Sequence, residues 1–345
     1  MNRSCASRAC LLLVFLLPAA GAWAQAREYT LTPEGVWTKT REPAEGGDEA
    51  LISQARALIA RGDHSRARSM LDEWIEGNEF KNNPWMPEAL LLHGDTNLAR
   101  GREESALRDY ERVVTDYPQS DTFVRALERE FEICRMYLGG LRRKILGLRL
   151  DSGLPIAEEF IVRIGERLPD SRLAERALIE LADHYFAQRD LPAAVEAYSV
   201  FQKLYPRSEH RQRAMARLVY ANVARFKGPR YDATSLREAA VQAERFAAEF
   251  PGEADRAGVT DALQSRIDES LGEQMLETAR WYLSRGDPVS ARFTLQRLLR
   301  RHPQSVAAAR GLDLLRERGW VRPGQDVLSA PGEGRIPEAL PREGR

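Results

Sequence analysis

SRLAERALIELADHYFAQRDLPAAVEAYSVFQKLYPRS, residues 171 to 208, contains two amphipathic helical patterns separated by a tight turn. Apolar residues recur at helical spacing on one face of each half. They are Ala177, Leu181, Ala182 and Tyr185 in the first half and Ala194, Val195, Tyr198 and Phe201 in the second. Gln188 to Asp190 interrupts the pattern, and Pro206 cannot continue a helix. The stretch therefore predicts two helices packed face to face, with the small Ala182 and Ala194 allowing close approach.

The same arrangement recurs along the chain. Three further turns begin at Gly62, Gly101 and Gly286, and each is followed by alanine and larger apolar residues at helical spacing. Aromatic-proline or similar stops end other helices, as in Tyr117-Pro118-Gln119-Ser120 and His302-Pro303-Gln304-Ser305. A unit of about 34 to 50 residues built as helix, turn, helix indicates an α-solenoid. We predict an all-α, tetratricopeptide-like solenoid of about five to six helix-turn-helix repeats.

The two ends of the chain differ from the repeats. The N-terminus has the order of a secretory signal peptide: arginines come first, then a short apolar run, then Ala22-Trp23-Ala24. Cleavage is expected near Ala24 or Ala26. The expected segments are a signal peptide at 1–24, an extended arm at 25–47, the solenoid at 48–319 and a disordered tail at 320–345. Cleavage there is expected to leave a soluble mature protein that begins near Gln25 or Arg27.

Composition limits the partner classes. The chain has 345 residues, with 51 basic and 51 acidic side chains. A net charge near zero argues against nucleic acid as a partner, because such binding needs an excess of Lys and Arg on one face. Cys5 and Cys10 would leave with the signal peptide, so Cys134 alone is expected in the mature protein, as a small apolar core residue. We find no lipobox cysteine after the apolar run.

Several places depart from the regular repeat. The stretch 141–149, LRRKILGLR, interleaves basic and apolar residues, which suits a membrane surface or an acidic partner. The alternative that we favour is a long loop whose Leu and Ile side chains lie under the solenoid. Asp48 is expected to cap the first helix, and one long helical region with an irregular start is expected from Glu253 to Leu283.

The sequence contains no motif that predicts catalysis. The five histidines are scattered, no Cys or His pair has metal-ligand spacing, and phosphate-binding and nucleophile-elbow motifs are missing. We therefore predict no enzyme activity, no metal and no cofactor. The concave side of a solenoid is instead a binding surface, and the first helices of the repeats line it. Candidate partner-binding residues there are Arg176, Asp183 and Phe186, and the irregular join at 228–232 adds Arg230 and Tyr231.

The chain resembles the outer-membrane assembly factor family BamD, or YfiO, of bacterial periplasmic tetratricopeptide proteins, in a divergent form like that of planctomycete-type bacteria. The resemblance covers about Asp48 to Arg318. It rests on the aromatic-Pro-x-Ser stops, the enlarged middle repeats and the Gly228-Pro229-Arg230-Tyr231-Asp232 join. Proteins of this family are normally lipid-anchored through an N-terminal cysteine, and this sequence departs from them there.

This resemblance implies a noncatalytic adaptor that helps assemble β-barrel proteins into the outer membrane, located in the periplasm and peripheral to that membrane. The partners that it implies are unfolded barrel substrates for residues 48–206 and barrel-assembly components for 207–318. Membrane association would come through partners or through the 141–149 insertion. The alternative is a periplasmic tetratricopeptide coordinator of cell-envelope, peptidoglycan or division proteins. A wall-degrading enzyme is a third hypothesis, but no segment is left over for its catalytic domain.

Overall fold

The computed structural model describes residues 29–31, 37–39, 47–79 and 81–321. The expected signal peptide, most of the arm and the tail from residue 322 lie outside these residues. The described helices are α1 (Asp48–Ala60), α2 (His64–Asn78), α3 (Met86–Ala99), α4 (Glu103–Asp116), α5 (Phe123–Leu138), α6 (Leu154–Arg167), α7 (Arg172–Ala187), α8 (Leu191–Leu204), α9 (Arg211–Arg225), α10 (Thr234–Glu249), α11 (Pro251–Arg256), α12 (Asp261–Ser284), α13 (Pro288–Arg301) and α14 (Val306–Glu317). The strands are β1 (Tyr29–Leu31), β2 (Trp37–Lys39), β3 (Arg142–Ile145) and β4 (Leu148–Ser152).

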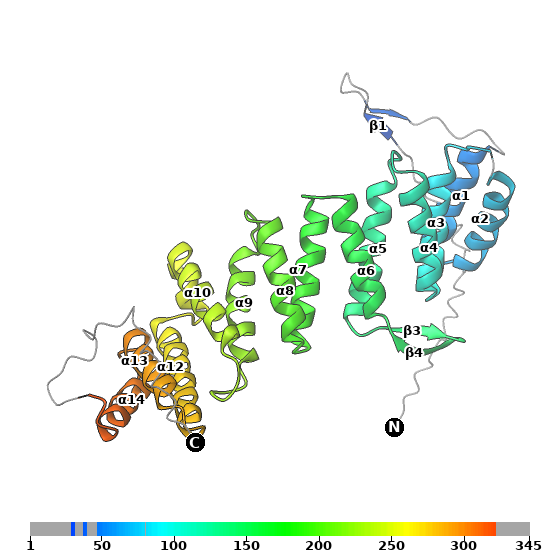
Figure 1. Cartoon of the computed structure of the whole chain (residues 1–345). Coiled ribbons are helices and arrows are strands. Elements are labelled where there is room, and N and C mark those ends of the chain that lie inside the picture. The colour runs from blue at the N-terminus through cyan, green and yellow to red at the C-terminus, as the bar shows by residue number, and fades with distance from the viewer. Residues whose placement is uncertain (1–28, 32–36, 40–46, 80, 322–345) are drawn as a thin grey trace, which may run out of the picture.

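The helices stand side by side in one elongated row, and apart from the short α11, which packs on α10, each is packed against its neighbours in the row (Figure 1). This is the predicted α-solenoid. Two antiparallel hairpins, β1-β2 and β3-β4, are added to it. In Figure 1 they lie at opposite edges of the row, β1-β2 above α5 and β3-β4 below α4 and α6.

The central pair α7 and α8 confirms the predicted helix contact. Ala182 and Ala194 have no exposed surface, and Tyr198 and Phe201 are equally buried beside them. Close approach of the two backbones at the alanines and filling by the aromatic rings produce the dense packing of a protein interior. The helix pair therefore follows directly from the spacing of these residues.

Turn chemistry fixes the start of each second helix. Gly62, Gly101 and Gly286 adopt positive φ angles of 80°, 67° and 76°, a conformation that glycine reaches without steric cost. An aspartate then caps two of the following helices: Asp63 accepts from the Arg66 amide and Asp287 from the Ser290 amide. In the α7-α8 turn Arg189 takes the left-handed position, with φ of 60°.

Three expectations about single elements were wrong. The stretch 141–149 forms most of the β3-β4 hairpin instead of a loop, and only the start of β4, LRLD, carries the period-2 alternation of a strand. The helical region expected from Glu253 is divided into α11 and α12 by residues 257–260. Asp48 is the first residue of α1 and caps nothing, since its carboxylate accepts hydrogen bonds from Trp74 Nε1 at 2.8 Å and Asn83 Nδ2 at 2.7 Å.

The hydrophobic core is continuous only through the first nine helices. One cluster runs from Ile52 in α1 to Leu218 in α9. Three smaller clusters follow, centred on Phe246, on Ile267 and on the α12-α13-α14 unit with Leu295 and Leu298. The solenoid therefore has one large N-terminal packing unit and a C-terminal part held by smaller contacts.

Candidate functional site

The three candidate residues on α7 make contacts between repeats. The Arg176 guanidinium lies 5.2 Å from the centre of the Phe131 ring in α5. Asp183 accepts a hydrogen bond from Tyr198 Oη in α8 at 2.6 Å and forms ion pairs with Arg213 and Arg217 in α9. The contacts of Asp183 therefore connect α7 to both α8 and α9.

Phe186 completes this cluster. Its ring meets the Tyr198 ring edge to face at 6.3 Å, and the Arg217 guanidinium lies 5.8 Å from its centre. Burial and the charge of Asp183 raise the pKa of the Tyr198 hydroxyl, so that this group stays protonated and donates to the carboxylate. Each of the three predicted residues on α7 is therefore engaged within the solenoid, and their role in partner binding stays a prediction.

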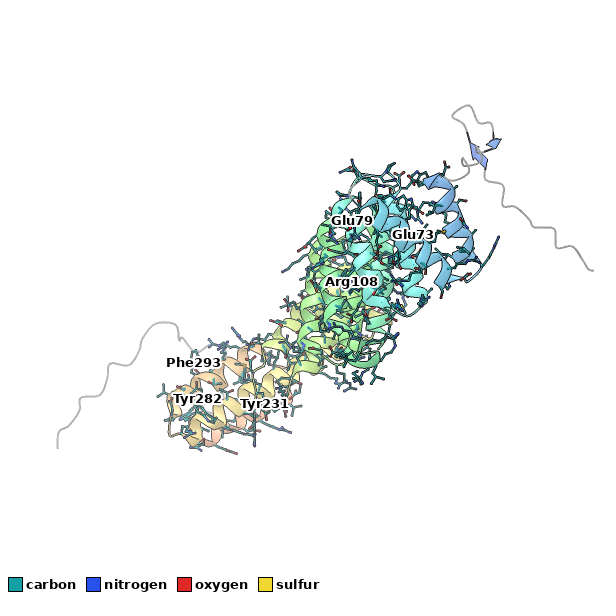
Figure 2. All side chains as sticks on the ribbon, turned by 90° about the vertical axis from the view of Figure 1, so that its right-hand side faces the viewer. Glu73, Glu79, Arg108, Tyr231, Tyr282 and Phe293 are labelled. Atoms are coloured by element: carbon teal, nitrogen blue, oxygen red, sulfur yellow. The ribbon has the colours of Figure 1, made fainter. Side chains whose placement is uncertain are left out.

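Arg230 and Tyr231 lie far from that cluster, in the join between α9 and α10. The Arg230 side chain is 86% exposed, and its Nε is 3.8 Å from Glu277 Oε2 in α12. Tyr231 is 59% exposed. Figure 2 labels Tyr231 in the C-terminal part of the molecule together with Tyr282 and Phe293. The structure therefore brings the join, and not the α7 residues, to a groove formed by the last helices.

This C-terminal groove consists of two adjoining depressions of about 620 and 590 Å³ that share Gln274 and Thr278 of α12. The first lies between α12 and α13 and reaches Arg237 of α10. The second lies between α12 and the α9-α10 join. The lining residues with aromatic or apolar side chains are Leu271, Met275, Trp281, Tyr282, Val289, Phe293 and Pro229.

The charge of the C-terminal groove is strongly positive. Five arginines and a single glutamate line it, although the whole chain is neutral. Glu277 is occupied by Arg280 at 2.6 Å and by Arg230 at 3.8 Å. Among the residues that the structure describes, no carboxylate pairs with Arg297 or Arg301. Their guanidinium groups are therefore available to carboxylates of a bound chain.

A single face of α13 carries both the exposed apolar side chains and the unpaired arginines of the groove. Val289, Phe293, Arg297 and Arg301 are four residues apart and so lie on one side of the helix. Val289 is 72% exposed and Phe293 is 54% exposed. Sequence reasoning missed this face, although the signal was present. Val289 and Phe293 are large apolar residues, and their helical positions are not on the face of the buried Leu295 and Leu298.

The buried His93 of the N-terminal repeats has a structural role. The two ring nitrogens of His93 face Asp72 at 2.8 Å and Asp109 at 2.9 Å, which links α3 to α2 and α4. Burial raises the pKa of the Cys134 thiol, as expected for a core cysteine. Within the described ranges, no three His, Cys, Asp or Glu side chains are grouped to hold a metal ion.

Comparison with known proteins identifies two family models. The model for YfiO, an outer membrane lipoprotein, matches residues 156–319, which are α6 to α14. A tetratricopeptide repeat model matches residues 88–120, which are α3 and α4. No curated protein matches the chain. No helix of the described part is both long enough and apolar enough to cross a membrane.

Solved structures similar to this chain include three proteins with low sequence identity. The C-terminal part of a TPR repeat-containing protein from Cytophaga hutchinsonii is 14% identical, with a TM-score of 0.30, 76% of this chain and 99% of that one covered. The TPR2AB-domain:pHSP90 complex of yeast Sti1 is 15% identical, with a TM-score of 0.29 and coverages of 80% and 87%. PilF of Pseudomonas aeruginosa is 12% identical, with a TM-score of 0.27 and coverages of 77% and 96%.

Proposed function

We propose that this chain, a divergent YfiO-like tetratricopeptide-repeat protein and thus a protein-interaction scaffold, acts in the periplasm in the assembly of β-barrel proteins into the outer membrane. Its working part would be the solenoid of residues 48–319. The YfiO match over α6 to α14 supports this role. Proteins of the YfiO and tetratricopeptide families are typically non-catalytic, and we propose the same here.

The observation that carries the proposal is the C-terminal groove. Exposed aromatic and apolar side chains lie there beside unpaired guanidinium groups, and an ordinary solvent-facing helix surface has no need of that combination. A chain segment with apolar anchors and nearby carboxylates would bury Phe293 and Val289 and pair with Arg297 and Arg301. The partner would be a barrel-assembly component or an unfolded barrel chain that presents such a segment.

Two charge-reversal variants test this use of the groove. Arg297→Glu combined with Arg301→Glu should lower partner affinity by about tenfold or more, because attraction at two sites becomes repulsion. Arg292→Glu combined with Arg300→Glu is the matched control, since these exposed arginines are on the same helix but do not line the groove. Equal binding by the two variants would exclude the groove as the binding surface.

The partner class is tested by affinity purification from crosslinked envelopes of the host, followed by mass spectrometry. We expect the wild-type protein and the control variant to capture the central barrel-assembly subunit or unfolded barrel proteins. The groove variant should capture less of both. Capture of peptidoglycan enzymes or division proteins in their place would support the alternative, a coordinator of cell-envelope work.

A further inference from the structure

The β3-β4 hairpin is held to the solenoid by three basic side chains along its strands. Arg149 Nη2 pairs with Glu103 Oε1 at 2.6 Å, and Arg143 Nε pairs with Glu104 Oε1 at 3.0 Å. The Lys144 ammonium also donates to the carbonyl oxygen of Gly101. All three contacts reach the first residues of α4 or the turn before it. The hairpin therefore lies in a fixed orientation along the edge of the row of helices, below α4 (Figure 1).

The end of this hairpin is apolar and exposed to solvent. Leu146 at the turn is 99% exposed, Leu148 64%, Leu150 57% and Ile145 45%. This is the opposite of the expected arrangement, in which these side chains lay under the solenoid. Ile145 and Leu148 are paired across the strands and share one face, while Lys144 and Arg149 share the other face, which meets α4. The hairpin is thus amphipathic, with its apolar side facing solvent.

Leucine at the turn is an unfavourable choice for folding. The two turn residues, Leu146 and Gly147, have φ angles of 51° and 84°. A two-residue turn with positive φ at both positions favours Asn-Gly or Asp-Gly, and a bulky side chain at the first position is strained there. Because neither the turn nor the core benefits from Leu146, its side chain points to a role in contact with another surface.

We propose that this hairpin is a lipid-binding element that inserts its apolar tip into the headgroup region of an anionic bilayer. Leu146 and Leu148 would enter furthest, and Ile145 and Leu150 would lie at the boundary. Arg142 is exposed at the start of β3 and pairs with no carboxylate among the described residues, so it would meet a lipid phosphate.

Charge favours a bilayer over a protein pocket as the occupant. The hairpin residues 141–152 carry four basic side chains and one acidic one, Asp151, which pairs with Arg143. The neighbouring Glu103 and Glu104 are neutralised by their ion pairs with the hairpin. A narrow two-stranded hairpin with an apolar end and an exposed cation, Arg142, at its base can enter a lipid interface without unfolding the solenoid. This inference is independent of the groove.

The first experiment measures flotation of the full chain with vesicles of phosphatidylglycerol and phosphatidylethanolamine. Leu146→Asn should reduce the bound fraction by about tenfold or more, because the apolar anchor is lost. The same change places asparagine where the turn favours it, so the melting temperature should stay equal or rise. Val162→Gln on α6 is the control, since Val162 is 57% exposed but lies outside the hairpin. It should bind vesicles like the wild type.

A second comparison separates the electrostatic part of the membrane contact from its apolar part. Arg142→Gln should reduce binding to the anionic vesicles but leave the weak binding to pure phosphatidylcholine vesicles unchanged. The proposal is overturned if the wild-type chain does not float with anionic vesicles at low salt, or if Leu146→Asn floats as well as the wild type. It is also overturned if Leu146→Asn loses a crosslinked protein partner while vesicle binding is unchanged, because the tip would then occupy a protein pocket.

Discussion

At the scale of single residues, the packing between α3 and α4 depends on the missing side chain of Gly94. A Cβ atom added there would lie 2.3 Å from Cε1 of the fully buried Tyr110 ring. The ring cannot move away easily, because its hydroxyl donates to Asp95 Oδ1 at 2.9 Å. We expect Gly94→Ala to lower the free energy of unfolding by about 1 to 3 kcal/mol through overpacking, as measured by urea denaturation.

Gly77 in α2 supplies the control for this prediction. Nothing lies within 4 Å of a Cβ atom built there, and its φ angle is in the ordinary range. Gly77→Ala should therefore leave stability unchanged or raise it by up to about 1 kcal/mol, through helix propensity alone. A similar loss of stability in both variants would show that Tyr110 does not limit the space at Gly94.

A second residue-scale prediction concerns the pH dependence of stability. Glu130 has no exposed surface, and burial, together with the charge of Glu111, raises its pKa to about 9. In the unfolded chain its pKa lies near 4.3. Between these values the unfolded state releases a proton that the folded state retains, so rising pH lowers stability. Glu130→Gln should remove this slope and raise stability at pH 7 to 8 by roughly 1 to 3 kcal/mol.

The measurement is the free energy of unfolding of the wild type and the variant at several pH values between 5 and 9. Glu128→Gln is the matched control, because Glu128 is exposed on the same helix and forms no ion pair with the described residues. It should leave the slope of the wild type intact. A Glu130→Gln variant with an unchanged slope would mean that another group is responsible.

At the scale of elements, Asp183 connects α7, α8 and α9. Asparagine there would lack the negative charge that Arg213 and Arg217 share, and one of the two acceptor oxygens would become an NH2 donor. We expect Asp183→Asn to reduce stability by about 1 to 2 kcal/mol, a value limited by the partial exposure of these groups. Denaturation and partner binding should be measured in parallel. Reduced binding at unchanged stability would instead support the sequence-based hypothesis that Asp183 contacts a partner.

The sequence predicted helices well and surfaces less well, for a physical reason. Helix spacing, turn glycines and helix-ending prolines are local signals, so α7 and α8 could be placed from Ala182, Ala194 and Pro206 alone. The C-terminal groove depends on which helix faces remain uncovered after the repeats stack. Without that stacking, Phe293 and Arg297 could not be recognised as lining a depression that adjoins the one lined by Arg230. The hairpin was missed because only two short strands with a bulge carry its pattern.

At the scale of the whole molecule, stability should be uneven along the solenoid. In such quasi-one-dimensional folds each repeat is stabilised by its neighbours, so regions with smaller contacts open first. The cluster from Ile52 to Leu218 is continuous, whereas the α12-α13-α14 unit has its own small core. Within the described part of the chain, the small cluster between α10 and α12 has three fully buried members, Leu236, Ala239 and Ile267.

We therefore expect native-state hydrogen exchange to be faster in residues 261–317 than in residues 86–204, and limited proteolysis to cut first near the α9-α10 join or at residues 257–260. The C-terminal groove lies in this less stable part. A bound partner would therefore lose some binding free energy to ordering the groove. The protection of the groove against exchange should rise with the concentration of the partner. Addition of a binding partner should slow exchange in α12 and α13 before it affects α3 to α8. Uniform protection along the chain, with one cooperative unfolding transition, would show instead that the small C-terminal contacts couple the two parts completely.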